Sequence, residues 1–190
     1  MWGSEYYDVG ANTFYPAELT PESVPCTGHT AFFSPVGHRM LLAGRNVFNG
    51  RSIARASCLI YYEGMFFTNL STGRESHSTS ELADGTLLIA GGLNDTMHPG
   101  DLQLSELLSF VHEATRGHRH PVTVRRGPDL NTGRSGHTAT VLLDGRILLC
   151  GGRVTLINDA QWKTSATNTA EVYDRTWRFV NILPRSFRRR

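Results

Sequence analysis

Hydrophobic and polar positions repeat along this chain in blocks that each predict a β-hairpin. Three blocks begin at a histidine: HTAFFSPVGHRMLLAG at His29, HSTSELADGTLLIAGG at His77 and HTATVLLDGRILLCGG at His137. In each block a first strand and a turn precede an apolar run, RMLLA, TLLIA or RILLC, that does not alternate with polar residues. Because such a run indicates a strand buried on both faces, the blocks predict small sheets stacked face to face.

Glycines recur at fixed distances from these histidines. They follow by eight and by fifteen residues: Gly37 and Gly44, Gly85 and Gly92, Gly145 and Gly152. In two copies the later glycine forms a doublet, with Gly91 or Gly151 before it. A doublet at a strand end is typical of a place where the backbone bends or approaches another segment closely. The histidine spacing falls near the ~40 to 50 residues of propeller-type repeats, with an insertion in the second interval.

The turn of each hairpin has its own chemistry. Asp84-Gly85 and Asp144-Gly145 are pairs that tolerate positive φ, so they predict two-residue type I′ turns. The first copy reads SPVG instead, and we expect a type I turn led by Pro35 with Gly37 in the left-handed conformation.

Similar residues also recur outside the hairpins. The segments NLSTGRESH and DLNTGRSGH both have an arginine three residues before the histidine, Arg74 or Arg134, where the first copy has Cys26. Further along, AEVYDRTWRF from Ala170 is similar to SEYYDVGANTF from Ser4, and SCLIYYEGMFF and SELLSF are weaker versions of the same piece. Self-similarity therefore organises nearly the whole chain.

These motifs resemble the kelch family of β-propeller proteins, in the variant common in galactose oxidase-like propellers. The resemblance rests on NTGRSGHTATVLLDGRILLCGG at 131–152, AEVYD at 170–174 and EYYDVGANTF at 5–14, which keeps the family's spacing of a tyrosine and an aromatic residue through Tyr7 and Phe14. It implies one motif for each four-stranded blade, with the recurrent residues as structural elements of the repeat.

Three positions depart from the family pattern. The first copy has Ala43-Gly44 in place of the doublet, Leu108 stands where tyrosine is expected, and Trp177 lies closer to Tyr173 than the family interval. We expect an irregular outer strand in those blades.

The resulting prediction is an all-β, kelch-type β-propeller segment of about three and a half four-stranded blades. It forms one domain over residues 1–190, and its units are approximately 1–20 (partial), 21–69, 70–127 and 128–190. Residues 111–127 are polar and irregular and predict a long loop and an outer strand. Since closed propellers have ~4 to 8 blades and kelch rings generally have six or seven, we expect an incomplete ring, completed by further blades or by a second chain.

The three repeated histidines, His29, His77 and His137, have two interpretations. Near the starts of the innermost strands, three imidazoles could converge on a metal ion. Because the histidines recur with the repeat, we favour a structural role in which each hydrogen-bonds its own loop. His118 and His120 project to one side of an extended segment and could bind zinc or copper, but a solvated loop is the favoured interpretation.

Arg74 and Arg134 also have two interpretations. A guanidinium can bind an anionic ligand through its donor fork. We favour the other interpretation, in which the arginines join adjacent blades through Glu171 or Asp174 and through backbone carbonyls.

Composition narrows the class of partner. The formal net charge of +2 is too small to attract the chain to nucleic acid or to an anionic membrane. The basic tail Arg185 to Arg190 is typical of a solvated chain end. No run of about 18 apolar residues predicts a transmembrane helix, and no signal peptide is evident at the N-terminus, so an intracellular location is slightly favoured. Three widely spaced cysteines predict no disulfide framework or zinc knuckle, and Cys150, inside an apolar run, is expected to be buried.

The sequence therefore predicts a non-catalytic scaffold that binds a protein partner through its loops, without a cofactor or metal. Self-association that completes a ring is a second expected partnership. The alternative is part of a galactose oxidase-like copper radical oxidase, or of another carbohydrate-active propeller. No tyrosine of the chain stands in a segment that matches the oxidase copper site, so no copper ligand is carried over from the resemblance.

Overall fold

The described part of the chain consists of β-strands and the turns between them. A computed structural model describes residues 4–17, 26–34, 39–48, 51–61, 65–94, 100–110, 122–158, 161–174, 176 and 178–182. Within these residues no helix occurs, and therefore none that could cross a membrane. The all-β prediction is confirmed.

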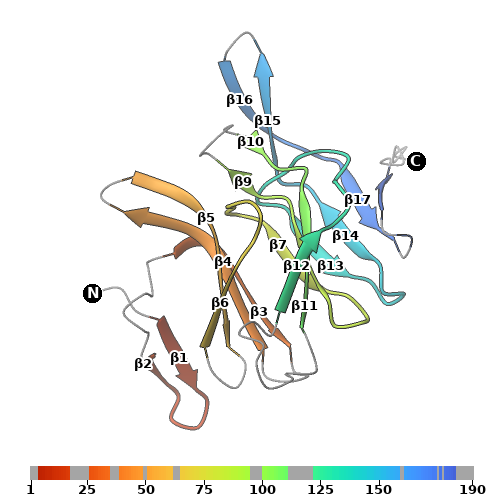
Figure 1. Ribbon diagram of the computed structural model, residues 1–190. Helices are drawn as coiled ribbons and strands as arrows, with labels where there is room; N and C mark the ends of the chain where they lie inside the picture. The colour runs from red at the N-terminus through yellow and green to blue at the C-terminus, as the bar shows by residue number, and fades with distance from the viewer. Residues whose placement is uncertain are drawn as a thin grey trace, which may run out of the picture.

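Three antiparallel sheets of four strands dominate the structure (Figure 1). Blade 1 consists of β3 (Cys26–Ser34), β4 (Arg39–Phe48), β5 (Arg51–Tyr61) and β6 (Met65–Asn69). Blade 2 consists of β7 (Ser78–Glu81), β8 (Leu87–Ala90), β11 (Ser105–Phe110) and β12 (Val122–Arg126). Blade 3 consists of β13 (Thr138–Val141), β14 (Ile147–Cys150), β17 (Ala170–Tyr173) and β18 (Phe179–Ile182). In each sheet the strands follow one another in chain order from one edge to the other, as in a propeller blade.

The chain begins with the outer half of a further blade. The strands β1 (Ser4–Asp8) and β2 (Thr13–Ala17) form a hairpin in which Tyr7 is opposite Phe14. This cross-strand pair matches Tyr173 opposite Phe179 in β17 and β18. Three blades and this half blade give the predicted three and a half, and the sheets are not closed into a ring (Figure 1).

Each blade also has a hairpin extension between its second and third strands, which we had not predicted. In blade 2 it is β9 (Leu93–Asn94) with β10 (Gly100–Asp101), and in blade 3 it is β15 (Arg153–Asn158) with β16 (Gln161–Ala166). In blade 1 the paired strands continue past a bulge between Ala43 and Arg45, where Gly44 lies. The extensions follow the glycine positions of the repeat, and β15–β16 projects furthest from its blade (Figure 1).

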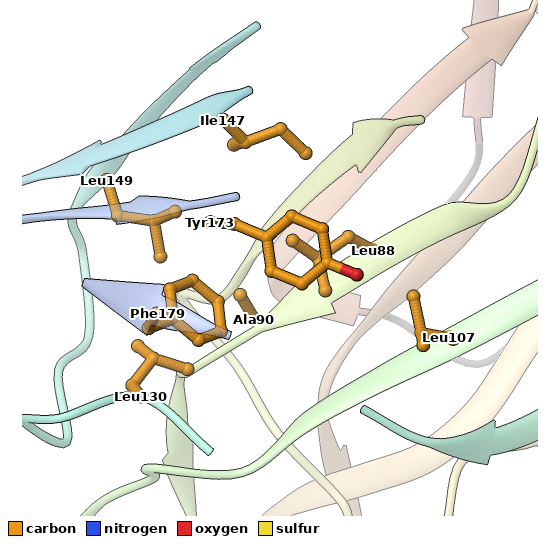
Figure 2. Close-up of a cluster of buried hydrophobic side chains, with 8 residues drawn as sticks. All are labelled: Leu88, Ala90, Leu107, Leu130, Ile147, Leu149, Tyr173 and Phe179. Carbon is orange, nitrogen blue, oxygen red and sulfur yellow. The ribbon is translucent and has the colours of Figure 1, made fainter. Parts of the chain in front are cut away.

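Blade 2 is buried on both faces because its neighbours cover it. Along β8, Leu87 and Ile89 belong to a core cluster that Phe32 of blade 1 joins. Leu88 and Ala90 point to the other side, into a cluster shared with blade 3. Figure 2 shows this second cluster, with the ring of Tyr173 directed at Leu88. The prediction that this apolar strand is buried on both faces is confirmed for β8.

The same prediction is wrong for β14. Ile147 and Leu149 are buried against blade 2, but Leu148 is only partly buried and Cys150 is exposed. The two residues face away from blade 2, and no described segment covers that side as blade 3 covers β8. Burial of Cys150 was inferred from its apolar neighbours in the sequence, whereas it depends on a next blade.

The turns differ from the predicted type I′. Gly85 has φ +79° and Gly145 has φ +81°, but neither Asp84 nor Asp144 has positive φ. The amide of Gly85 donates to Leu82 O, and that of Leu82 donates to Thr86 O. This is the pattern of a three-residue loop, in which a type I turn is followed by a left-handed glycine. Each aspartate accepts a hydrogen bond from the backbone amide two residues on, which favours this loop.

Several predicted features lie outside the described residues. They are the Pro35 turn with Gly37, the pair His118 and His120, and Trp177. Of the segment 111–127, the outer strand is present as β12.

Candidate functional site

The most extensive polar site in the described residues is a buried ion pair in blade 3. Arg134, just before β13, has Nη2 2.7 Å from Oε1 of Glu171 in β17, and both side chains are fully buried. Its Nη1 donates to the carbonyl oxygens of Gly151 at 3.0 Å and Thr169 at 3.1 Å. The arginine thereby joins the start of the innermost strand to the second and third strands of its blade.

Glu171 accepts several further hydrogen bonds. The backbone amide of Asn131 donates to Oε2 at 2.7 Å, and that of Thr132 donates to Oε1 at 3.1 Å. The side-chain amide of Asn131 donates to Oε2 at 3.0 Å. Burying a carboxylate costs free energy because it loses its hydration. The guanidinium and the several hydrogen-bond donors around Glu171 offset that cost. The carboxylate of Glu171 therefore finds its partners within one blade, whereas Arg134 Nε is buried without a hydrogen-bond partner among the described residues.

Blade 2 contains a second copy of this site. Arg74 pairs through Nη2 with Oε1 of Glu106, and both side chains are buried. Its Nη1 donates to Gly91 O and Leu104 O, each at 3.0 Å, and the amide of Ser71 donates to Oε2 of Glu106 at 2.7 Å. We did not identify Glu106 from the sequence. Alignment of SELL at 105–108 with AEVY at 170–173 could have found it.

The predicted role of the arginines therefore needs two corrections. Their side chains tie strands of one blade together, whereas we expected them to join adjacent blades. Asp174, offered as a partner, pairs instead with Arg178, 3.1 Å from its Nε, and accepts from Thr176. One link between blades 2 and 3 uses the arginine backbone, since Gly92 N of blade 2 donates to Arg134 O at 2.9 Å.

The repeated histidines join blades. His77 Nε2 lies 2.8 Å from Thr30 Oγ1 of blade 1, and His137 Nε2 lies 2.8 Å from Ser78 Oγ of blade 2. In both cases the partner is the residue that follows the histidine in the preceding repeat. The expectation that each histidine bonds its own loop is wrong for His77 and His137, because the innermost strands of neighbouring blades run close enough to exchange side-chain bonds.

A second bond between blades runs through the backbone beside each histidine. Ser76 N donates to Gly28 O, and Gly136 N donates to Ser76 O, each at 2.8 Å. All three residues have φ between +53° and +60°. The same contact thus connects blades 1 and 2 and then blades 2 and 3.

Burial holds both interior histidines neutral. It lowers the pKa of His77 from 6.5 to about 3, and the charge of Arg74 adds to the effect. It lowers the pKa of His137 to about 4, with a further contribution from Arg134 that Glu171 opposes. Within the described residues, neither Nδ1 atom has a hydrogen-bond partner. Protonation would place a second donor and a charge in an interior that already holds an arginine.

We therefore expect the free energy of unfolding to fall as the pH falls below about 6.5. The unfolded imidazoles bind protons there, whereas the folded ones stay neutral until pH about 4 or about 3. Each histidine should cost up to ~1.4 kcal/mol per pH unit in this window. Urea unfolding at pH 7.5, 6.0 and 5.0 measures the slope, which His77→Gln and His137→Gln should each reduce. Equal slopes in all three proteins would contradict the prediction.

The glycine doublets lie where the backbone is left-handed and crowded. Gly91 has φ +62°, and a Cβ there would lie 2.5 Å from Arg134 O of blade 3. Gly92 and Gly152 have φ of +104° and +92°, and their Cβ atoms would meet carbonyl oxygens of their own repeats at 2.8 and 2.6 Å. Gly151 has φ +66° but meets only Thr167 O, at 3.7 Å. Three of these glycines are required by close approach as well as by φ.

The predicted tyrosines occupy equivalent positions with opposite exposure. Tyr173 packs edge-on to Phe179, and both lie in the cluster shared with blade 2. Burial raises the pKa of Tyr173 to about 12. Tyr7 packs against Phe14 with ring centroids 5.0 Å apart and donates to Asn12 Oδ1, but it is exposed.

Comparison with solved structures supports the fold. A fungal alcohol oxidase of the AA5 family, in complex with copper, superimposes with a TM-score of 0.64 and 18% sequence identity. The match covers 96% of this chain and 38% of the oxidase chain, so the present chain spans less than half of that protein. No family model and no curated protein matches the sequence. The predicted likeness to galactose oxidase-like proteins is thereby supported at the level of fold.

Proposed function

We propose that the chain is a non-catalytic, kelch-like propeller segment that binds a protein partner through the hairpin extensions of its blades. The observation that carries this proposal is that the recurrent polar residues have structural roles. Histidines, arginines and glutamates of the repeat are engaged in holding strands and blades together. Recognition is left to residues that do not recur, which in a rigid repeat scaffold are those of the loops.

The extension β15–β16 is the best candidate for the binding surface. Its strands project beyond blade 3 (Figure 1), and Lys163, Thr164 and Ser165 are exposed. The extension of blade 2 lies next to it, because β10 contacts β15. Neighbouring hairpins of unrelated sequence on a fixed base provide a surface that can vary without disturbing the core.

A hairpin replacement tests this proposal. In the variant, residues 154–165 are replaced by a short Asn-Gly turn, which leaves the doublet and β17 in position. We expect the parent chain to capture a partner that binds the purified chain saturably, and the variant to lose at least tenfold in affinity at an unchanged melting temperature. Replacing the exposed Leu143, at the opposite hairpin turn, by Asp should leave binding intact. Equal binding by the hairpin variant would refute the proposed surface.

The second candidate is part of a copper oxidase, favoured by the structural likeness to the AA5 alcohol oxidase. The described residues do not fit a copper site. No three His, Cys, Asp or Glu among them are grouped to hold a metal ion, and the buried His77 and His137 use Nε2 for bonds to the preceding blade. Copper content and peroxide release on alcohols or aldehydes discriminate the two candidates. One equivalent of copper with peroxide release, both measured on the full-length protein, would favour the oxidase, whereas a metal-free, inert full-length protein removes that candidate.

A further inference from the structure

The interface between blades 2 and 3 is formed by one face of blade 2. Following the strand register, that face includes Ser78 and Ser80 of β7, Leu88 and Ala90 of β8, and Leu107 of β11. All five residues are buried. Blade 3 packs on them with Tyr173 and Phe179, which are 4% and 6% exposed.

The equivalent face of blade 3 is open at most positions, although Val172 of β17, which the register places on it, is buried. The register places Thr138, Thr140, Leu148 and Cys150 on it. Thr138, Thr140 and Cys150 are exposed and Leu148 is partly buried, although their counterparts in blade 2 are all buried. Two apolar residues of β18 on the same face, Val180 and Ile182, are 43% and 44% exposed. This set of residues is called the open face below.

The other half of such an interface is exposed at the opposite end of the chain. In the β1–β2 hairpin, Tyr7 and Phe14 are 46% and 64% exposed. They occupy the register of Tyr173 and Phe179, and the two ring pairs have similar centroid separations, 5.0 and 5.3 Å. One end of the chain therefore displays the aromatic pair that blade 3 uses, and the other end displays the kind of face that receives it.

We propose that the open face of blade 3 binds the β1–β2 hairpin of a second copy of this chain, head to tail. This contact continues the established series of blade interfaces, with Tyr7 and Phe14 on Leu148 and Cys150 as Tyr173 and Phe179 lie on Leu88 and Ala90. Because the two surfaces differ, the contact is heterologous and produces a closed ring or an open chain of copies. The proposal is independent of the hairpin extensions and of any partner that they bind.

Sedimentation velocity over a concentration series tests the proposal with three variants. Leu148→Asp damages the open face and Phe14→Asp damages the hairpin, while Leu143→Asp changes an exposed apolar residue elsewhere. We expect the parent chain and Leu143→Asp to self-associate, and the other two variants to weaken association at least tenfold. Thr140→Arg, at an exposed position of the open face, replaces Leu148→Asp if that variant lowers the melting temperature.

Mixing gives the decisive result. The Leu148→Asp chain keeps an intact hairpin and the Phe14→Asp chain keeps an intact open face, so an equimolar mixture can form one productive contact. We expect a 1:1 complex from two chains that are monomeric alone. A parent chain that stays monomeric at all concentrations, association that neither variant weakens, or a mixture without the complex would each overturn the proposal.

Discussion

Replacing Arg134 with Met is expected to lower the free energy of unfolding by about 3 to 5 kcal/mol. Methionine fills similar volume but leaves the carboxylate of Glu171 buried without its guanidinium. The carbonyl oxygens of Gly151 and Thr169 lose their donor as well. Removing one member of a buried, hydrogen-bonded ion pair is costly because the other member cannot recover its hydration. Urea unfolding at pH 7.5 measures the loss.

The exposed pair of Arg146 with Asp144 provides a matched control. Its Nε–Oδ2 distance is also 2.7 Å, but about half of each side chain is exposed. Arg146→Met should therefore cost less than about 1 kcal/mol. The double variant Arg134→Met/Glu171→Met should regain part of the stability that Arg134→Met loses. If Arg134→Met unfolded like Arg146→Met, and instead lost the affinity for a ligand, Arg134 would be a recognition residue.

The second large effect is expected at the doublet glycines, where one substitution tests the interface between blades. Gly91 and Gly151 occupy the same position of the repeat with nearly the same φ, +62° and +66°. The left-handed conformation alone should cost roughly 1 kcal/mol when either becomes alanine. At Gly91 the added Cβ would also meet Arg134 O at 2.5 Å and His137 Cε1 at 3.0 Å, both in the following repeat. We expect Gly91→Ala to cost about 3 kcal/mol in total.

Chemical denaturation of the two alanine variants, side by side, measures this difference. The cost of the left-handed backbone is common to both variants. The additional loss of stability at Gly91 therefore measures how closely blade 3 packs against blade 2. Equal losses at Gly91 and Gly151 would mean that blade 3 does not approach blade 2 as described.

The sequence predicted those parts of the fold that depend on local pattern and repetition. Three histidine-led hairpins, the apolar runs and the resemblance to kelch propellers were sufficient to predict four-stranded blades and an open ring. The sequence pattern does not indicate which residues of another blade lie next to a given side chain. His77 bonds Thr30 of the preceding blade, and Cys150 is exposed because the next face is uncovered. Both interpretations assumed that residues near in sequence determine a side chain's environment.

The missed features have equally physical causes. Glu106 is difficult to identify from the sequence because its strand has Leu108 where the motif has tyrosine, so SELL at 105–108 and AEVY at 170–173 share only the glutamate. The extension hairpins begin after the glycines that end the second strand of each blade. The residues that follow these glycines have no repeated pattern from which a hairpin could be predicted. The Asp-Gly pairs predicted two-residue turns, whereas hydrogen bonds of Leu82 and Leu142 close three-residue loops in which only glycine is left-handed.

The central claim is that the recurrent residues stack three blades in series, so that blade 2 is covered on both faces and blade 3 on one. Native-state hydrogen exchange measures this most directly, at a concentration where the chain sediments as a monomer. Strands β8 and β14 have the same place in the repeat, but only β8 lies between two blades. We predict that the amides of Leu88 to Ala90 exchange at least ~10-fold more slowly than those of Leu148 to Cys150, a difference of ~1.4 kcal/mol in opening free energy. Equal protection in the two strands, or slower exchange in β14, would contradict the account.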